Sequence, residues 1–358
     1  MLLTGILIPS YAYTYIKMSS IKQLIMDVNS LKKLNDLKTI KEFIEYISPY
    51  YPDISIKENT IVEIEQALFD VYIKLIGKIL YYSPENMRIF LRALLLKFEI
   101  TNIKQIILGS ITGLNKKEKS KRVNFLVEEL LEKKVFIENL LEITSLDEIQ
   151  LYMKNTKYNK AIREGLLYFK DNHQIFVLES FLDRLFYENL DLSGKLYKRK
   201  ENDLIPEFIK YKTEIYNLRI ISRGIQNKVD KKLLKQFFVD NYLFFNREKI
   251  NELLPLIDLK EFISKLESYY KKIPQLKKFG INTQLIRKHL RWSLEGLYQD
   301  YYFKKNKIKI DDFEYLTIYK ILEIIINKEK EIKFNIMPNV IRILHEKYEE
   351  LGVKDENF

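Results

Sequence analysis

The stretch KYKTEIYNLRIISRG, residues 210–224, has a close counterpart earlier in the chain, LLKFEITNIKQIILG, residues 95–109. Both stretches read Lys-x-Glu-Ile-x-Asn, continue with apolar residues at helical spacing, and reach a glycine. Apolar residues that recur every three or four positions are typical of a helix with one face buried. The sequence therefore predicts the same helix twice.

The acid and the amide of each stretch share one helical face. Glu99 lies three residues before Asn102, and Glu214 lies three residues before Asn217. Residues three apart on a helix are neighbours, so we expect each pair to meet an adjacent helix or loop through hydrogen bonds. The two acids are 115 positions apart (214 − 99), and a third, degenerate copy carries Glu331 a further 117 positions along (331 − 214).

The glycines that close the two stretches predict helix ends. Gly109 and Gly224 are followed by polar residues. Glycine often adopts the left-handed conformation just after a helix. We expect both residues to serve as such caps.

Two further markers recur in the same order. A Leu/Ile-Glu pair lies 34 to 36 residues before each acid of the first marker (99 − 65, 214 − 179 and 331 − 295), and a Ser/Thr/Asp-x-x-Glu motif lies further upstream. The latter motif is typical of a helix start, because the first side chain accepts from free backbone amides. These motifs are Thr39 to Glu42, Ser145 to Glu148 and Asp258 to Glu261.

Three markers that occur three times predict three similar helical bundles. We place them at residues 1–122, 123–240 and 241–358. The chain holds only 10 Gly and 8 Pro in 358 residues, and it shows neither hairpin dipeptides nor sustained alternation of apolar and polar residues. The predicted fold class is all-α.

The composition limits the possible functions. There is no cysteine, which excludes disulfides, thiolate catalysis and cysteine-based metal centres. The N-terminal apolar run lacks the basic residues of a signal peptide, and no run of about 18 apolar residues predicts a membrane span. The net charge of +11 suggests an acidic partner, although its lysine clusters are equally typical of solvated helix ends.

The motifs of catalysis are missing from the sequence. The three histidines, His173, His289 and His345, do not show metal-ligand spacing. The segment from Ser193 to Lys195 lacks both the first glycine and the hydroxyl residue of a phosphate-binding loop. We therefore expect no catalytic residue, no metal and no cofactor.

With these markers in place, the chain resembles the family of C subunits, also called d subunits, of V-type and archaeal A-type rotary ATPases (ATP synthases). The family phrase, Lys-Glu-x-Glu-Val/Ile-Arg-Asn-Leu, appears here from Lys97 to Ile103, from Lys212 to Leu218 and, without its asparagine, from Lys328 to Ile332. The Tyr-rich start at 11–25 and the segment 145–158 are also similar to the family.

The resemblance implies both a fold and a role. It implies three bundles related by pseudo-threefold symmetry that form a funnel, which joins the central shaft (D- and F-type subunits) to the membrane proteolipid c-ring. One copy per complex would lie at the cytoplasmic face of the membrane, peripheral to it, and would couple ATP turnover to H⁺ or Na⁺ transport. The subunit itself would catalyse no reaction and would bind no nucleic acid. The candidate structural or partner-binding residues are Glu99, Asn102, Glu214, Asn217, Arg219 and Glu331.

Two other interpretations remain open at this stage. One is a basic helical-repeat protein that binds nucleic acid, which the net charge would favour. The other is a general helical scaffold. The acidic and apolar character of the recurring residues argues against the first.

Overall fold

The computed structural model describes residues 61–195, 204–287 and 290–306, with residue 17 and short stretches between residues 33 and 56 (33–37, 39–51, 54 and 56). Within these residues the chain is helical and contains no strand, which confirms the predicted all-α class. None of the helices described there is both long enough and apolar enough to cross a membrane.

The chain forms two compact units, residues 1–88 with 307–358 and residues 89–306. The first unit contains the short 3-10 helix η1 (Leu34–Asp36), α3 (Ile40–Ile47) and α4 (Ile61–Tyr82). The helix α5 (Glu85–Ile111) begins in this unit and continues into the second. The prediction of three bundles at residues 1–122, 123–240 and 241–358, and of a funnel, stays a prediction.

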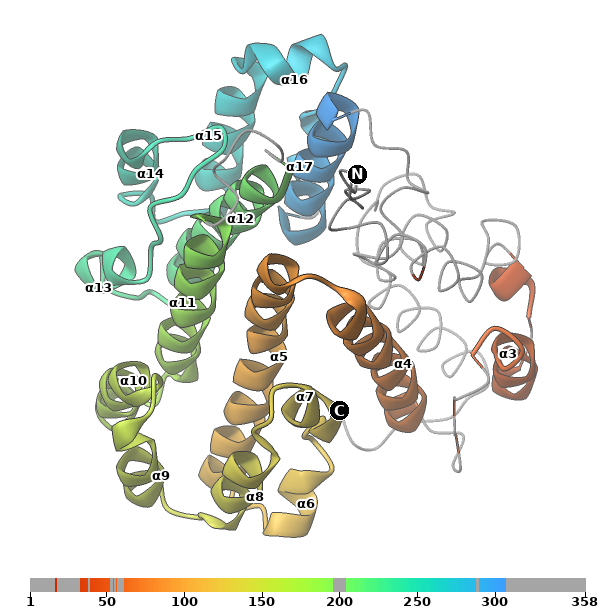
Figure 1. The fold of residues 1–358 in the computed structure, drawn as a ribbon. Helices are drawn as coiled ribbons and strands as arrows, with labels where there is room; N and C mark the ends of the chain where they lie inside the picture. The colour runs from red at the N-terminus through yellow and green to blue at the C-terminus, as the bar shows by residue number, and fades with distance from the viewer. Residues whose placement is uncertain are drawn as a thin grey trace, which may run out of the picture. The chain divides into compact units, whose positions relative to one another are not determined.

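The second unit contains long helices separated by runs of short ones (Figure 1). After α5 the order is α6 (Lys116–Ser120), α7 (Phe125–Leu130), α8 (Lys134–Glu142), α9 (Leu146–Tyr152), η2 (Met153–Asn155), α10 (Asn159–Asn172) and α11 (Ile175–Gly194). Then follow α12 (Leu204–Gln226), α13 (Lys231–Gln236), α14 (Arg247–Leu253), α15 (Leu259–Lys271), α16 (Pro274–Lys278), η4 (Gln284–Arg287) and α17 (Leu290–Asn306).

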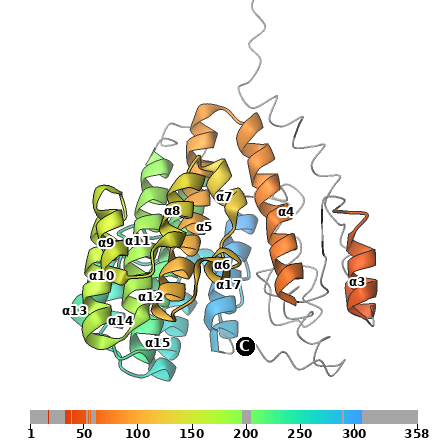
Figure 2. The same cartoon turned by 90° about the horizontal axis from the view of Figure 1, so that it is seen from below.

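The helices of the second unit recur along the chain. The pairs α6 and α13, α10 and α16, and α11 and α17 each begin 115 residues apart (231 − 116, 274 − 159 and 290 − 175). The long helices α11, α12 and α17 pack in sequence, α11 against α12 and α12 against α17. Figure 2 shows α9, α10 and α11 side by side at one edge of this unit.

The three predicted helix starts are confirmed. The side chains of Thr39, Ser145 and Asp258 accept hydrogen bonds from the backbone amides three residues later, at 3.1, 3.4 and 3.0 Å. Each therefore caps its helix, α3, α9 or α15. A cap of this kind satisfies one of the amides that the first helical turn leaves unpaired.

The prediction that Gly109 and Gly224 are left-handed caps is wrong. The helix α5 continues to Ile111 and α12 to Gln226, so both glycines lie inside their helices. The left-handed residues come four positions later, at Gly113 (φ 74°) and Lys228 (φ 53°). The residue after each left-handed one then donates its backbone amide to the carbonyl of the glycine. Leu114 donates to Gly109 at 2.8 Å and Val229 donates to Gly224 at 3.0 Å, as in a Schellman motif.

Close packing explains why these positions are glycine. A Cβ atom on Gly109 would lie 2.6 Å from Cγ of Lys119, and one on Gly224 would lie 2.5 Å from both terminal carbons of Leu234. In each case the neighbour lies ten residues later, on α6 or α13. The glycine therefore allows the following short helix to approach the long one.

Candidate functional site

Glu214 anchors the loop that precedes α14. Its carboxylate is fully buried and accepts from three successive backbone amides, those of Leu243 (2.6 Å), Phe244 (2.9 Å) and Phe245 (3.0 Å). It also accepts from the hydroxyl of Tyr298 on α17. One side chain of α12 thus fixes both a loop 29 to 31 residues later and the last long helix.

The surroundings of Glu214 are aromatic, and the side chains of Tyr270 and Tyr298 beside it are fully buried. The hydroxyl of Tyr298 also meets that of Tyr270 at 2.8 Å, and the rings of Phe244 and Tyr298 lie 5.1 Å apart. Burial raises the pKa of Glu214, while the Tyr298 hydroxyl and the three backbone amides act in the opposite direction. Loss of this acceptor would leave buried amides without a partner, which is costly.

Asn217, one turn along α12, holds the same connection at a second point. Its side chain donates to the carbonyl of Val239 at 2.8 Å and accepts from the amide of Val239 at 3.1 Å. Asn217 is fully buried, so neither group of the amide can exchange its partner for water. The pair of bonds fixes the position of Val239 against α12.

Asn102 makes the same contact in the earlier copy of the pattern. Its side chain donates to the carbonyl of Asn124 and accepts from the amide of Asn124, both at 2.9 Å. The two residues are 22 positions apart, as are Asn217 and Val239. The two asparagines therefore perform one structural task at equivalent positions.

Glu99 is buried like Glu214 but has different partners. Its carboxylate accepts from the amine of Lys133 at 2.5 Å, and the amine of Lys157 lies 3.6 Å away. Both lysines also lie over the ring of Tyr158, 5.7 and 5.1 Å from its centre. Burial is the main cause that lowers the pKa of Lys157 to about 8, and the charge of Lys133 acts in the same direction while that of Glu99 opposes it.

A second buried acid, Glu128, completes this cluster. Its Oε1 atom accepts from Asn102 at 2.7 Å, whereas among the described residues its buried Oε2 atom has no hydrogen-bond partner. Burial raises the pKa of Glu128 to about 7, and the nearby Glu99 adds to the rise. The sequence did not single out Glu128, because nothing in its local pattern marks α7 as buried on this side.

Arg219 belongs to an ion-pair network between α12 and α17. Its guanidinium lies 3.8 Å from one oxygen of Glu295, and the amine of Lys212 lies 2.9 Å from the other. All three side chains are at least two-thirds buried, at 14 to 30% exposure. Unlike the buried residues Glu99, Asn102, Glu214 and Asn217, Arg219 is partly accessible. The sixth predicted residue, Glu331, lies outside the described residues.

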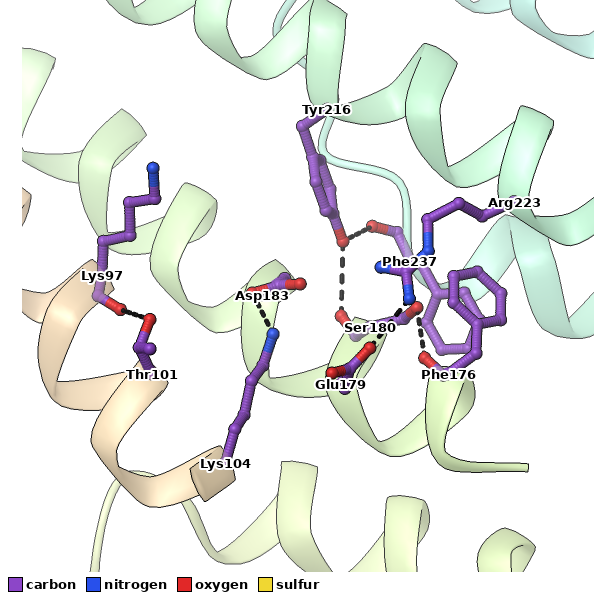
Figure 3. A network of polar contacts seen from close by, with 10 residues as sticks. All are labelled: Lys97, Thr101, Lys104, Phe176, Glu179, Ser180, Asp183, Tyr216, Arg223 and Phe237. Carbon is purple, nitrogen blue, oxygen red and sulfur yellow. Dashed lines mark hydrogen bonds and ion pairs between the residues drawn. The ribbon is translucent and has the colours of Figure 1, made fainter. Parts of the chain in front are cut away.

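A matching ion pair joins α5 to α11. The amine of Lys104 lies 2.6 Å from Asp183, and one turn earlier on α11 Glu179 lies 2.8 Å from Arg223 of α12 (Figure 3). Lys104 is 115 residues before Arg219 (219 − 104), so equivalent cations of α5 and α12 each bind an acid on another long helix.

In the sequence, Lys97 and Lys212 stand out only as part of the recurring phrase. Both belong to the same charged region, since Lys212, Glu295, Arg219 and Asp183 all act on the pKa of Lys97. The recurrence of basic residues at equivalent positions of α5 and α12 was the signal in the sequence that could have pointed to these ion pairs.

Within the described part of the chain no group of acids and histidines is arranged to hold a metal ion.

Over the residues that the structure describes, these features define a helical protein in which buried acid and amide side chains fasten two long helices, α5 and α12, to the segments that follow them. The chain belongs to the ATP synthase (C/AC39) subunit family, which it matches over residues 17–337. The family resemblance seen in the recurring phrase is thereby confirmed.

Individual relatives agree with the family. The chain is 24% identical over 335 residues to the C subunit of the A-type ATP synthase of Methanocaldococcus jannaschii. The aligned region covers 90% of this chain and 80% of that relative. It is 23% identical over 327 residues to the C subunit from Methanococcoides burtonii, and this alignment covers 86% of this chain and 80% of that relative. It is 19% identical over 330 residues to that of Thermococcus kodakarensis, covering 90% and 84%.

Proposed function

We propose that this chain is the non-catalytic central-stalk socket of a V/A-type rotary ATPase. In this role it links the rotating shaft to the membrane proteolipid ring and so couples ATP turnover to H⁺ or Na⁺ transport. The observation that carries the proposal is the family match over residues 17–337. The relatives named as C subunits of A-type ATP synthases support it.

The internal ties of the second unit suit a part that transmits torque. The ion pair of Lys104 with Asp183 joins α5 to α11, and the ion pair of Lys212 with Glu295 joins α12 to α17. Glu214 adds a buried connection between α12, the loop before α14, and α17. Cross-links between helices distant in sequence resist shear, because the helices cannot slide without breaking buried polar contacts.

The proposed partners are the D- and F-type shaft subunits on one side and the proteolipid c-ring on the other. The chain would bind them as a single copy, peripheral to the membrane at its cytoplasmic face. In the proposed role Glu99, Asn102, Glu214 and Asn217 keep the socket rigid and contact no partner, because they are buried within the chain.

Copurification tests this proposal directly. A tagged full-length chain expressed in its own cells is expected to retain the shaft subunits and the proteolipid ring after mild detergent extraction. A chain that is recovered alone, from cells that contain the assembled motor, would contradict the proposal. A tagged Glu214→Ala chain measures how far retention depends on the rigid frame.

The alternative role in nucleic-acid binding gains no specific support. Several lysines from the basic clusters are engaged within the chain, since Lys116 pairs with Glu142 and Lys305 pairs with Glu207. Lys119 is fully buried and donates to the carbonyl of Ile143 at 2.6 Å. Salt-dependent binding to duplex DNA at low ionic strength would revive this alternative.

A further inference from the structure

A titratable side chain lies at the contact between α7 and α5. Glu128 of α7 is fully buried, and its Oε1 atom accepts from the side chain of Asn102 on α5 at 2.7 Å (Figure 1). The same Asn102 binds the backbone of Asn124, the residue that caps α7 at its N-terminus. Two polar contacts that hold α7 to α5 therefore meet at one side-chain amide.

The second oxygen of Glu128 is the unusual feature of this contact. Although Oε2 is buried, it has no hydrogen-bond partner among the described residues. A carboxylate placed there would lose its hydration without a compensating donor, whereas an uncharged carboxyl has far less hydration to lose. The geometry of the closed contact therefore favours the protonated acid.

The charged groups that act on Glu128 are already paired with one another. Lys133, in the turn after α7, donates its backbone amide to the carbonyl of Glu128 at 2.7 Å and its amine to Glu99 of α5 at 2.5 Å. The amine of Lys157, in the segment before α10, lies 3.6 Å from the same Glu99. The ring of the buried Tyr158 lies under both amines. Glu99 thus takes up both cations, and neither forms an ion pair with Glu128.

The pKa of Glu128 agrees with this arrangement. Burial is the largest cause that raises it to about 7, and the charge of Glu99 adds to the rise, while Asn102 and the two lysines oppose it. In an open contact the carboxyl is hydrated and has its ordinary pKa of 4.5. Between these values the closed contact keeps a proton that the open one loses. Closure is therefore favoured at low pH and weakens as the pH rises through about 7.

Two other titratable groups of this contact leave the same pH range clear. Burial lowers the pKa of Lys157 to about 8, so its amine stays charged below that value and favours closure only as the pH rises above it. Burial raises the pKa of Tyr158, so its hydroxyl keeps its proton. Of these three groups, Glu128 is the one whose charge changes between about pH 5 and about pH 7.

The equivalent contact of α12 lacks the acid. The residue 115 positions after Glu128 (243 − 128) is Leu243, whose backbone amide binds Glu214. Asn217 holds Val239 there through two hydrogen bonds to its backbone. The chain therefore contains a second asparagine contact of the same design, with leucine at the position of the buried carboxyl.

We propose that Glu128 is a pH-sensitive latch, whose protonated side chain holds α7 against α5 and whose ionisation releases α7 while the remainder of the second unit stays folded. Release separates Glu128 from Asn102 and exposes the backbone amides of Asn124 and Lys133, which the closed contact protects. The latch is a property of the chain by itself, so its test does not depend on the socket role.

Native-state hydrogen exchange of the full-length chain between pH 5 and pH 8 tests the latch. After correction for the exchange rate of free amides, the opening that Asn124 and Lys133 report is expected to become about 10- to 70-fold more frequent across this range. In Glu128→Gln, which cannot titrate, the opening is expected to be the same at both pH values. Glu128→Leu, with the side chain of the equivalent position, is the second variant and is expected to lose the pH response as well.

The amide of Val239 separates local release from unfolding of the whole chain. At pH 8 Asn124 is expected to open at least about tenfold more often than Val239. Equal opening of the two amides would show that α7 is not released by itself, and it would overturn the latch. A pH response of Asn124 that persists in whichever of the two Glu128 variants folds would overturn it too, because another group would then control the contact.

Discussion

The side-chain amide of Asn217 makes two hydrogen bonds to the backbone of Val239, one to its carbonyl at 2.8 Å and one from its amide at 3.1 Å. The equivalent pair, Asn102 with Asn124, is arranged in the same way. A fully buried amide that satisfies a backbone donor and acceptor together is difficult to replace, because most other side chains leave one of them unpaired.

Replacement of Asn217 by Ala is expected to destabilise the chain by about 2–3 kcal/mol and to expose the Val239 amide to hydrogen exchange. Asn102→Ala serves as the matched variant, and it is expected to expose the backbone amide of Asn124, rather than that of Val239, to hydrogen exchange. Native-state exchange measured for both variants checks the pairing. Unchanged protection at Val239 in Asn217→Ala would show that the backbone is held by other contacts.

Glu214→Ala is expected to cost more, about 3–5 kcal/mol, because three backbone amides and the Tyr298 hydroxyl lose their acceptor together. Glu214→Gln is expected to cost about 1–2 kcal/mol, since the remaining carbonyl oxygen can still accept from the loop. Urea denaturation of the two variants measures the difference. Equal losses would mean that the charge, rather than the acceptor geometry, holds the loop.

The buried acid Glu128 predicts a pH dependence of stability. Its pKa in the folded chain, about 7, lies above the ordinary value of 4.5, so the folded chain retains the proton over a range in which the unfolded chain loses it. The contribution of Glu128 to the free energy of unfolding is therefore fully present below about pH 4.5, and it is lost as the pH rises through about 7.

Glu128→Gln removes this titration. Relative to the unchanged chain, the variant is expected to gain up to about 3 kcal/mol between about pH 4 and about pH 8. Unfolding free energies of both proteins at the two pH values provide the measurement. A constant difference between the proteins would indicate that the pKa of Glu128 is the same in the folded and in the unfolded chain.

Two glycines at helix contacts, Gly165 and Gly194, are expected to differ in the loss of stability that alanine causes there. A Cβ on Gly165 would lie 2.8 Å from the Cα atom of Leu178, whereas the nearest atom to one on Gly194 is the terminal Cδ1 of Ile209 at 2.6 Å. Backbone cannot move aside as a side-chain end can, so Gly165→Ala is expected to destabilise by about 1–3 kcal/mol. Gly194→Ala is expected to stay within about 1 kcal/mol, as thermal unfolding of both variants will show.

Local patterns in the sequence predicted part of this structure. The helical class follows from apolar spacing and few breaks, and the caps at Thr39, Ser145 and Asp258 follow from motifs that act within four residues. Asn102 and Asn217 each bind a neighbouring segment, as their place on the helical face predicts. These features could be predicted because each depends on the spacing of residues within one helix or within its first turn.

Features that depend on tertiary packing could not be predicted in the same way. Glu99 and Glu214 occupy equivalent positions, yet one binds a lysine amine and the other binds backbone amides, because different segments fold against them. Gly109 resembles a helix cap in sequence, but the approach of Lys119 from α6 explains it better.

The most direct test of the socket role is the number of ions transported per ATP hydrolysed in vesicles that contain the reconstituted motor. Motors assembled without this chain are expected to hydrolyse ATP but to transport no ions, and addition of the purified chain is expected to restore transport. Ion transport at the full ratio in the absence of the chain would contradict the socket role.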